Sequence, residues 1–226
     1  MRIHVVTQAN RHLYLPELDA FFRARHDIYV HEKRWRDPSA SGLEIDQFDH
    51  GGAAYLIGFE EDGTLVGGTR LIPSSQPHMV SEVFASYCDL EPIPNRTDVA
   101  EWTRAFVVPR FRRERLRVVY HACAAVMRYC LDEGVTRVGG LQECYWLPLW
   151  AKLGWNVRTL GRPQQIAGDT CIVAYMDVTQ AAFKSACEQA GIEAPMLVQR
   201  GPHRPFQSLT WAPMLARPEK VLGVAA

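Results

Sequence analysis

The stretch VAEWTRAFVV, residues 99–108, predicts a strand, and the proline that follows it, Pro109, ends that strand. PRFRRER then begins a predicted long helix, and Gly134 ends it, because glycine readily adopts the left-handed conformation found after helix ends. The apolar positions of this helix are Leu116, Val119, Tyr120, Cys123, Met127, Cys130 and Leu131. A strand, a turn and a long helix therefore form the expected centre of the fold.

The elements before this unit are a strand, a helix and a hairpin. Residues 3–7 predict a short strand, and apolar residues at helical spacing after Pro16 predict an amphipathic helix. These apolar residues are Leu18, Phe21, Phe22, Ile28 and Tyr29. Two β-rich runs, 53–60 and 64–72, flank the turn EDG and predict a hairpin. Residues 73–98 have little periodicity and predict a long excursion with a short helix.

The elements after the long helix continue the alternation of strands and helices. Strands are predicted at 135–142, 156–160 and 170–178, and helices at 145–153 and 179–190. Gly154 ends the first of these helices, and Thr179 can cap the second through its hydroxyl. This order predicts an α/β fold of three layers, with a mixed, twisted sheet and helices on both faces.

The expected domain organisation is one domain and a tail. We expect residues 1–190 to form the domain, and the proline-containing residues 191–226 to pack on it or trail from it. Phe206 and Trp211 are the side chains expected to order this tail against the core.

Composition excludes several functional classes. The 226 residues are 47% hydrophobic and 22% charged, with 25 basic and 25 acidic side chains, so no overall charge attracts nucleic acid or a membrane. No C-x-x-C pair or histidine-rich spacing occurs among the six cysteines, so no zinc or other metal site is expected. No apolar run approaches the length of a membrane span, and we expect a cytoplasmic protein.

Acidic residues stand out in EIDQFDH, residues 44–50. Asp46 and Asp49 offer acceptors for a cationic or amino-bearing ligand, although an isolated D-x-x-D is more often a solvated loop. Arg25 falls on the apolar stripe of the first helix, where a guanidinium is costly unless a carboxylate meets it. We expect Asp46, Asp49 or a ligand carboxylate to be that partner, or the guanidinium to reach the edge of the stripe.

The motif EWTR contains the second polar pair. Glu101 and Arg104 would face opposite sides of a regular strand, so a bulge or strong twist must lie between them if both serve one site. Five arginines follow in residues 110–117, at a helix start that can hold an anion. A solvated basic turn is an equally good interpretation of this cluster.

The order of elements resembles that of the acyl-coenzyme A N-acyltransferase superfamily, in which the helix start after the donor strand takes the pyrophosphate. The glycine-rich loop of that superfamily is missing from RFRRERL, so arginine side chains would have to replace a backbone cradle.

A narrower resemblance is carried by several motifs in a fixed order. The chain is similar to the LuxI-type acyl-homoserine-lactone synthases in Arg25 and Trp35, EIDQFD, GGTRLIP, SEVF and EWTR. The segments NRHLY, RHDIYVHEKRW and ECYWLP are most similar to members that use branched-chain or aryl acyl-coenzyme A. Tyr29 stands where the broader family often has Phe.

This resemblance implies acyl transfer from a thioester to the amine of S-adenosylmethionine, followed by lactonisation with release of methylthioadenosine. Both molecules are substrates, and no permanently bound cofactor is implied. Glu101 is the expected catalytic base, acting directly or through a water. The expected S-adenosylmethionine-binding residues are Arg25, Trp35, Asp46, Asp49, Arg70 and Arg104.

Two further groups of residues are candidates for binding the acyl donor. The candidates for the acyl pocket are Phe84, Phe106, Tyr145 and Trp146, and those for docking coenzyme A phosphates or an acidic acyl-carrier protein are Arg110, Arg112 and Arg113. The histidines taken as structural are His78, His121 and His203.

Two alternative functions remain open at this point. They are an acyl-coenzyme A N-acyltransferase for another amine, and a non-catalytic relative that binds a thioester or nucleoside. The sequence specifies neither the acyl group nor the oligomeric state.

Overall fold

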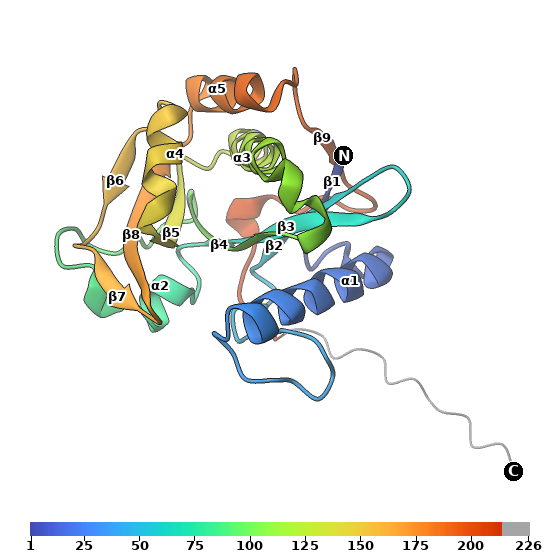
Figure 1. Cartoon of the computed structure of the whole chain (residues 1–226), viewed down its shortest axis with the longest axis horizontal. Coiled ribbons are helices and arrows are strands. Elements are labelled where there is room, and N and C mark those ends of the chain that lie inside the picture. Colours follow the sequence, from blue (N-terminus) through green and yellow to red (C-terminus); the bar gives the residue numbers. More distant parts are fainter. Residues whose placement is uncertain (214–226) are drawn as a thin grey trace, which may run out of the picture.

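The computed structural model describes residues 1–213, which form one nine-stranded mixed sheet with helices on both faces (Figure 1). The strand order is β6-β8-β5-β4-β3-β2-β1-β9, and β7 pairs with β8. The strands are β1 (Arg2–Val6), β2 (Ala54–Phe59), β3 (Leu65–Pro73), β4 (Val99–Val107), β5 (Arg137–Glu143), β6 (Val157–Thr159), β7 (Gln164–Ile166), β8 (Asp169–Asp177) and β9 (Met196–Val198). The α-helices are α1 (Leu15–His26), α2 (Met79–Glu82), α3 (Arg115–Asp132), α4 (Leu147–Lys152) and α5 (Gln180–Ala190).

Two helices cover opposite faces of the central strands. α1 lies on one face, where its Leu18, Phe21 and Phe22 join a buried cluster with residues of β1, β2 and β3 (Figure 1). α3 lies on the other face and packs with α5 in a larger cluster that includes Cys123 and Met127. The helical spacing read from the sequence therefore corresponds to two separate apolar layers, with the sheet between them.

A β-bulge interrupts β4 between Glu101 and the end of the strand. Arg104 and Ala105 lie opposite the single residue Thr69 of β3, and Arg104 has a φ of 55°, which is rare for a residue with a side chain. The Thr69 hydroxyl donates to the carbonyl of Thr103 at 2.9 Å and accepts from the Trp102 indole at 2.6 Å. The bulge predicted from EWTR is therefore confirmed.

The strands β4 and β5 diverge in the middle of the sheet. Their parallel pairing covers Val99, Ala100 and Glu101, and it ends where Glu101 meets Gly139. Beyond this point β4 continues along β3, while β5 continues along β8. Beyond the divergence, backbone N–H and C=O groups on the facing edges of β4 and β5 do not hydrogen-bond to each other. Such groups can bind a ligand that enters the sheet there.

The long helix begins later than predicted. Residues Pro109–Glu114 form a 3-10 helix, and α3 starts only after them. No side-chain cap bond forms at Glu114, and the arginines of this segment oppose the helix dipole, which explains why it does not join the α-helix. Leu116, predicted to be buried, is 60% exposed, while Val118 is buried.

The end of the described chain contains structure that the sequence did not predict. The three-residue strands β7 and β9 were not predicted; β9 pairs with β1 and brings the tail into the sheet. Phe206 is buried, as predicted, whereas Trp211 is 53% exposed and its backbone N–H donates to Gln76. The part of the predicted tail from 214 onward lies outside the described residues. Within residues 1–213, no helix has the length and apolarity needed to cross a membrane.

Candidate active site

Three arginines and three carboxylates converge on the face of the sheet that α1 covers. The arginines come from α1, β3 and β4, and the carboxylates from the turn-like segment before β2: Arg25, Arg70, Arg104, Glu44, Asp46 and Asp49. The acidic segment thus folds back over β3 and β4, as the two motifs required. We refer to these six side chains as the arginine–carboxylate network.

The deepest part of the network is built around two arginines. The two Nη atoms of Arg25 donate to the two oxygens of Asp49 at 2.8 and 2.9 Å, and its Nε donates to Glu44 at 2.6 Å. Arg70 donates to Asp46 at 2.6 Å and lies 2.9 Å from Asp49. Such fork-shaped pairing requires a guanidinium, because a lysine ammonium cannot present two parallel donors.

Burial makes these ion pairs interdependent. The side chains of Arg25, Arg70 and Asp49 are 0% exposed. Burial disfavours the charged form of Asp49, but the charges of Arg25 and Arg70 outweigh it and hold the pKa of Asp49 well below its usual range. Tyr55 adds a hydrogen bond of 3.0 Å to the same carboxylate. The inner part of the network therefore remains ionised and fully satisfied.

The outer part of the network is built around Arg104. Arg104 donates to Asp46 at 2.7 Å and to Glu44 at 2.9 Å, and its side chain is 8% exposed. Its guanidinium lies 5.1 Å from the ring centre of Tyr29, which in turn stacks on Trp35 at 5.7 Å. Arg104 and the two aromatic rings therefore connect the buried charges to the surface.

Trp35 lies at an open, polar hollow rather than in the buried network. The hollow has a volume of about 260 Å³ and is lined by Arg34, Trp35, Arg36 and Asp37. Trp35 is 38% exposed, and the ammonium of Lys33 lies 4.0 Å from its ring centre. The expected binding residues thus comprise five in one network and one, Trp35, beside it.

Glu101 occupies a separate buried position on the same sheet face. Its two oxygens accept hydrogen bonds from the backbone N–H groups of Met79, at 2.9 Å, and Val80, at 2.7 Å. Burial raises the pKa of Glu101, and the nearby His78 and these two donors oppose that shift. Because Met79 also contacts Arg104 through its sulfur at 3.6 Å, α2 links Glu101 to the network.

Sequence reasoning missed four side chains of this region. They are Glu44, Tyr29, Tyr55 and His78, of which Glu44 and Tyr29 lay inside the quoted motifs. Glu44 could have been found as a third carboxylate beside D-x-x-D. The other contacts depend on which strands and turns become neighbours, and no local pattern signals that.

The four residues expected in the acyl pocket contact different neighbours. Phe84 packs on Tyr87 at 5.6 Å, whereas Phe106 packs on Phe21 of α1 at 5.4 Å. Tyr145 and Trp146 lie together at 5.2 Å between ring centres. Trp146 belongs to a cluster of four indoles around Trp150: Trp146 and Trp155 stack on Trp150, and Trp102 lies tilted against it.

The arginines expected to dock the donor lie in the 3-10 helix before α3. Arg110, Arg112 and Arg113 are exposed, and Arg112 forms an ion pair of 2.6 Å with Glu32. These cations follow the end of β4 in the sequence, beyond the point at which β4 and β5 diverge. Their side chains are accessible to an anionic donor.

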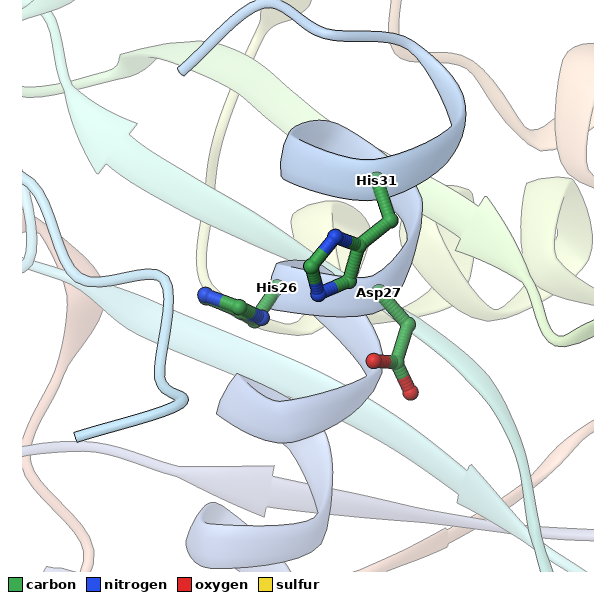
Figure 2. Close-up of side chains that lie close together, drawn as sticks. All are labelled: His26, Asp27 and His31. Carbon is green, nitrogen blue, oxygen red and sulfur yellow. The ribbon is translucent and has the colours of Figure 1, made fainter. Parts of the chain in front are cut away.

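One group within residues 1–213 could hold a metal ion. Figure 2 shows His26, Asp27 and His31, whose possible ligand atoms all lie within 4.8 Å of one another. The group forms where α1 continues as a π-helix, Asp27–Glu32, because the wider turn brings His31 back over His26. No metal site was predicted from the sequence, and acyl transfer from a thioester to an amine requires no metal ion.

Comparison with known proteins identifies the family. The chain matches the autoinducer synthase family over residues 10–186. It is 35% identical over 201 residues to an isovaleryl-homoserine lactone synthase of Bradyrhizobium diazoefficiens, covering 88% of this chain and 89% of the relative. An acyl-homoserine-lactone synthase of Agrobacterium fabrum is 22% identical over 202 residues, covering 87% and 96%.

Solved structures of similar proteins support the same family assignment. A structure of BjaI, a coenzyme A-dependent acyl-homoserine lactone synthase with S-adenosylmethionine and isopentyl-coenzyme A, has a TM-score of 0.84 and 33% identity, covering 91% of this chain and 96% of that one. The coenzyme A-dependent synthase MesI has a TM-score of 0.79 and 34% identity, covering 87% and 98%. The chain belongs to the autoinducer synthase family and is an acyltransferase of the acyl-homoserine-lactone synthase type.

Proposed function

We propose that this chain transfers a short, branched acyl group from coenzyme A to the amine of S-adenosylmethionine and then releases an acyl-homoserine lactone. The observation that carries the proposal is the meeting of the arginine–carboxylate network and buried Glu101 beside the divergence of β4 and β5. An ordinary N-acyltransferase needs a donor site in the sheet, but it has no need of a buried set of three arginines and three carboxylates.

The network supports binding of S-adenosylmethionine through its outer members. The substrate brings a sulfonium, an ammonium and a carboxylate, and the outer network presents Asp46, Glu44 and Arg104 side by side. Carboxylate oxygens that already accept from an arginine retain lone pairs for a cationic group. Trp35 and Tyr29 offer aromatic faces to the sulfonium, through cation–π attraction.

The acyl thioester fits between the diverging strands. Its carbonyl would meet free backbone N–H groups of β4 near residues 105–107, which would stabilise the oxyanion of the tetrahedral intermediate. The amine of S-adenosylmethionine must first lose a proton, and the negative charge of Glu101 draws that proton toward the β4 strand. Attack on the carbonyl carbon then breaks the C–S bond and releases the coenzyme A thiol.

Lactone closure needs no further side-chain nucleophile. The carboxylate oxygen of the acylated substrate attacks its own γ-carbon, the C–S bond of the sulfonium breaks, and methylthioadenosine leaves with the electron pair. The positive charge of the sulfonium is neutralised in this step. Holding the substrate folded over the network provides the proximity that this intramolecular reaction requires.

Packing on the α3 face supports a short acyl group. The ring centres of Trp102 and Trp146 each lie 5.9 Å from that of Trp150, and Trp102 belongs to β4 at the divergence. Large, stacked rings next to the donor strand leave little room for a long chain. A branched five-carbon group agrees with the isovaleryl and isopentyl groups named for the relatives described above.

The test uses the purified full chain with S-adenosylmethionine and isovaleryl-coenzyme A. We expect equal amounts of free thiol, methylthioadenosine and isovaleryl-homoserine lactone by mass spectrometry, and a much slower reaction with octanoyl-coenzyme A. Isovaleryl-loaded acyl-carrier protein serves as the second donor, because its acidic surface would suit the same arginines. An acyl amide without methylthioadenosine would instead indicate an ordinary N-acyltransferase, and absence of thiol release a non-catalytic relative.

Two further proposals concern the whole chain. We place the reaction in the cytoplasm, where both small-molecule substrates are made. We treat the tail as part of the same domain up to residue 213, because β9 and Phe206 join the sheet and the core.

A further inference from the structure

Two buried polar atoms near Glu101 have no hydrogen-bond partner among the described residues. They are Nε2 of His78 and the hydroxyl of Tyr175, and both residues are 1% exposed. A buried polar group without a partner costs free energy, so such atoms are rare unless a ligand satisfies them. Finding two of them beside one carboxylate points to a place where a polar substrate group binds.

The position of His78 follows from the structure of α2. His78 is the N-cap residue of α2, and the next two backbone N–H groups, of Met79 and Val80, donate to the carboxylate of Glu101. Among the groups that oppose the raised pKa of Glu101, the His78 side chain has the largest effect. The imidazole and the carboxylate therefore lie close together, although no direct ion pair joins them among the described residues.

The hydrogen bonds of His78 determine its tautomer. Nδ1 lies 2.8 Å from the carbonyl oxygen of Gln76, and a carbonyl only accepts hydrogen bonds. Nδ1 therefore carries the proton, and in the neutral ring Nε2 carries a lone pair. Nε2 and the Glu101 oxygens are thus hydrogen-bond acceptors, and the carboxylate among them carries a negative charge. The matching ligand is a cationic group rich in N–H bonds, which is an ammonium.

We propose that Nε2 of His78 takes the proton from the substrate ammonium, with the Glu101 carboxylate beside it to stabilise the imidazolium that forms. This inference rests on the proposed function and names the proton acceptor within it. It gives His78, which the sequence analysis took as structural, a catalytic role, and it gives Glu101 an electrostatic one.

The proton balance of the step is complete. The ammonium transfers one proton to Nε2, and the freed nitrogen lone pair forms a C–N bond to the thioester carbon. When the tetrahedral intermediate collapses, the C–S bond breaks and the thiolate takes the second amine proton. The His78 imidazolium then returns its proton to solvent.

Tyr175 supports the same location independently. It lies opposite Gly139 in β5, which lies opposite Glu101 in β4, and registered partners present their side chains to the same face of a sheet. Burial raises the pKa of Tyr175, and the charge of Glu101 adds to the shift. Its hydroxyl remains protonated, and its oxygen can accept a hydrogen bond from the incoming ammonium.

The decisive variant is His78→Asn. Asparagine is a good N-cap residue, and its amide can still donate to the Gln76 carbonyl, but it has no atom at the Nε2 position. We expect kcat to fall by about 10²- to 10⁴-fold, the typical contribution of a general base. The Kd for S-adenosylmethionine should stay within a few-fold, and Tm should be unchanged or higher, because the lost atom was unpaired.

The pH profile separates a base from a merely structural residue. With the base removed, only substrate whose amine is already deprotonated can react, and an α-amine has a pKa of about 7.7–8.0. The variant's rate should therefore rise steadily through pH 8 to 9, where the wild type has levelled off. The double variant with Glu101→Gln should lose less than the product of the two single losses, because the two side chains act as a unit.

The control is His121→Asn. His121 also carries an unpaired Nε2, but it belongs to α3 and the charges that act on it include Arg117 and Glu60, not Glu101. This variant should retain wild-type kcat and the wild-type profile. If His78→Asn keeps wild-type kcat and profile, the inference is overturned while lactone synthesis by the wild type still stands; if the wild type forms no lactone, it is the proposed function that fails.

A measurement on the unaltered protein covers the case in which the variant does not fold. Histidine-selective ¹⁵N NMR should show Nε2 of His78 unprotonated in the free protein and shifted when S-adenosylmethionine is added. A Nε2 resonance that already carries a proton at pH 8, or that does not move with substrate, would rule out His78 as the acceptor.

Discussion

Asp49 illustrates how single residues decide whether this site exists. Its carboxylate accepts two hydrogen bonds from Arg25 and one from Tyr55, and lies 2.9 Å from Arg70. Buried charges are tolerated only when they are paired, so each residue here depends on its neighbours. The network is consequently a structural unit as much as a binding surface.

Asp49→Asn should destabilise the protein by about 3–5 kcal/mol, because it leaves two buried guanidinium groups without full compensation. Urea unfolding followed by fluorescence would measure this. Asp19→Asn is the control, since Asp19 pairs with Arg23 at the surface of α1, where such pairs contribute about 0–1 kcal/mol. Equal unfolding midpoints for both variants would show that Asp49 is not buried as described.

At the scale of elements, two irregularities place the functional groups. The bulge in β4 turns Arg104 toward the face that carries Glu101, and the early end of the β4–β5 pairing opens the sheet at the same level. The 3-10 helix that follows carries the exposed arginines. Regular strands and a regular helix would have separated these groups.

Charge reversal of Arg112 and Arg113 to Glu should raise KM for isovaleryl-coenzyme A several-fold at low salt, with a smaller change in kcat. The reason is loss of attraction to the donor phosphates, and the effect should shrink as salt screens the exposed charges. Initial rates at two ionic strengths would measure it. Arg128→Glu, farther along α3, provides the control. Similar KM values for all three proteins would leave the basic turn as a solvated surface.

At the scale of the whole molecule, stability should depend on pH through buried histidines. Burial lowers the pKa of His4, His50 and His121, that of His121 to about 4 from 6.5. At a pH between the native and the unfolded pKa of such a histidine, the unfolded chain binds more protons than the native protein. The free energy of unfolding therefore decreases as pH falls through this range. Glu101 acts in the opposite direction, because its raised pKa lets the native state take up a proton first.

We therefore expect the urea concentration at the midpoint of unfolding to decrease as the pH is lowered from 7 to 4.5. The three histidines outnumber the single opposing carboxyl group. Asp49 adds to the loss only below about pH 4, since its native pKa is depressed from 3.8. His121→Asn should reduce the fall without removing it. A midpoint that is constant over this range would contradict the burial of these rings.

Much of the architecture was predictable because it depends on local chemistry. The hairpin, β4, the Thr179 cap and the turn at Gly134 follow from alternation, a hydroxyl at a helix start and a glycine in the left-handed region. The spaced motifs also identified the family, and the unpaired guanidinium on an apolar stripe required a carboxylate partner. These features need only neighbours in sequence, or the rule that a buried charge must be neutralised.

Other features were decided by the tertiary structure. β7 and β9 are too short to carry a pattern and exist because a neighbouring strand completes their hydrogen bonds. Glu44 joins the network because the segment before β2 lies against Arg104, and His78 lies near Glu101 because the long excursion packs against β4. By itself the sequence determined the family, the bulge and the need for paired charges. Which acceptors stand unpaired beside Glu101 was decided in three dimensions, because hydrogen bonding depends on distance and direction between atoms that lie far apart in the chain.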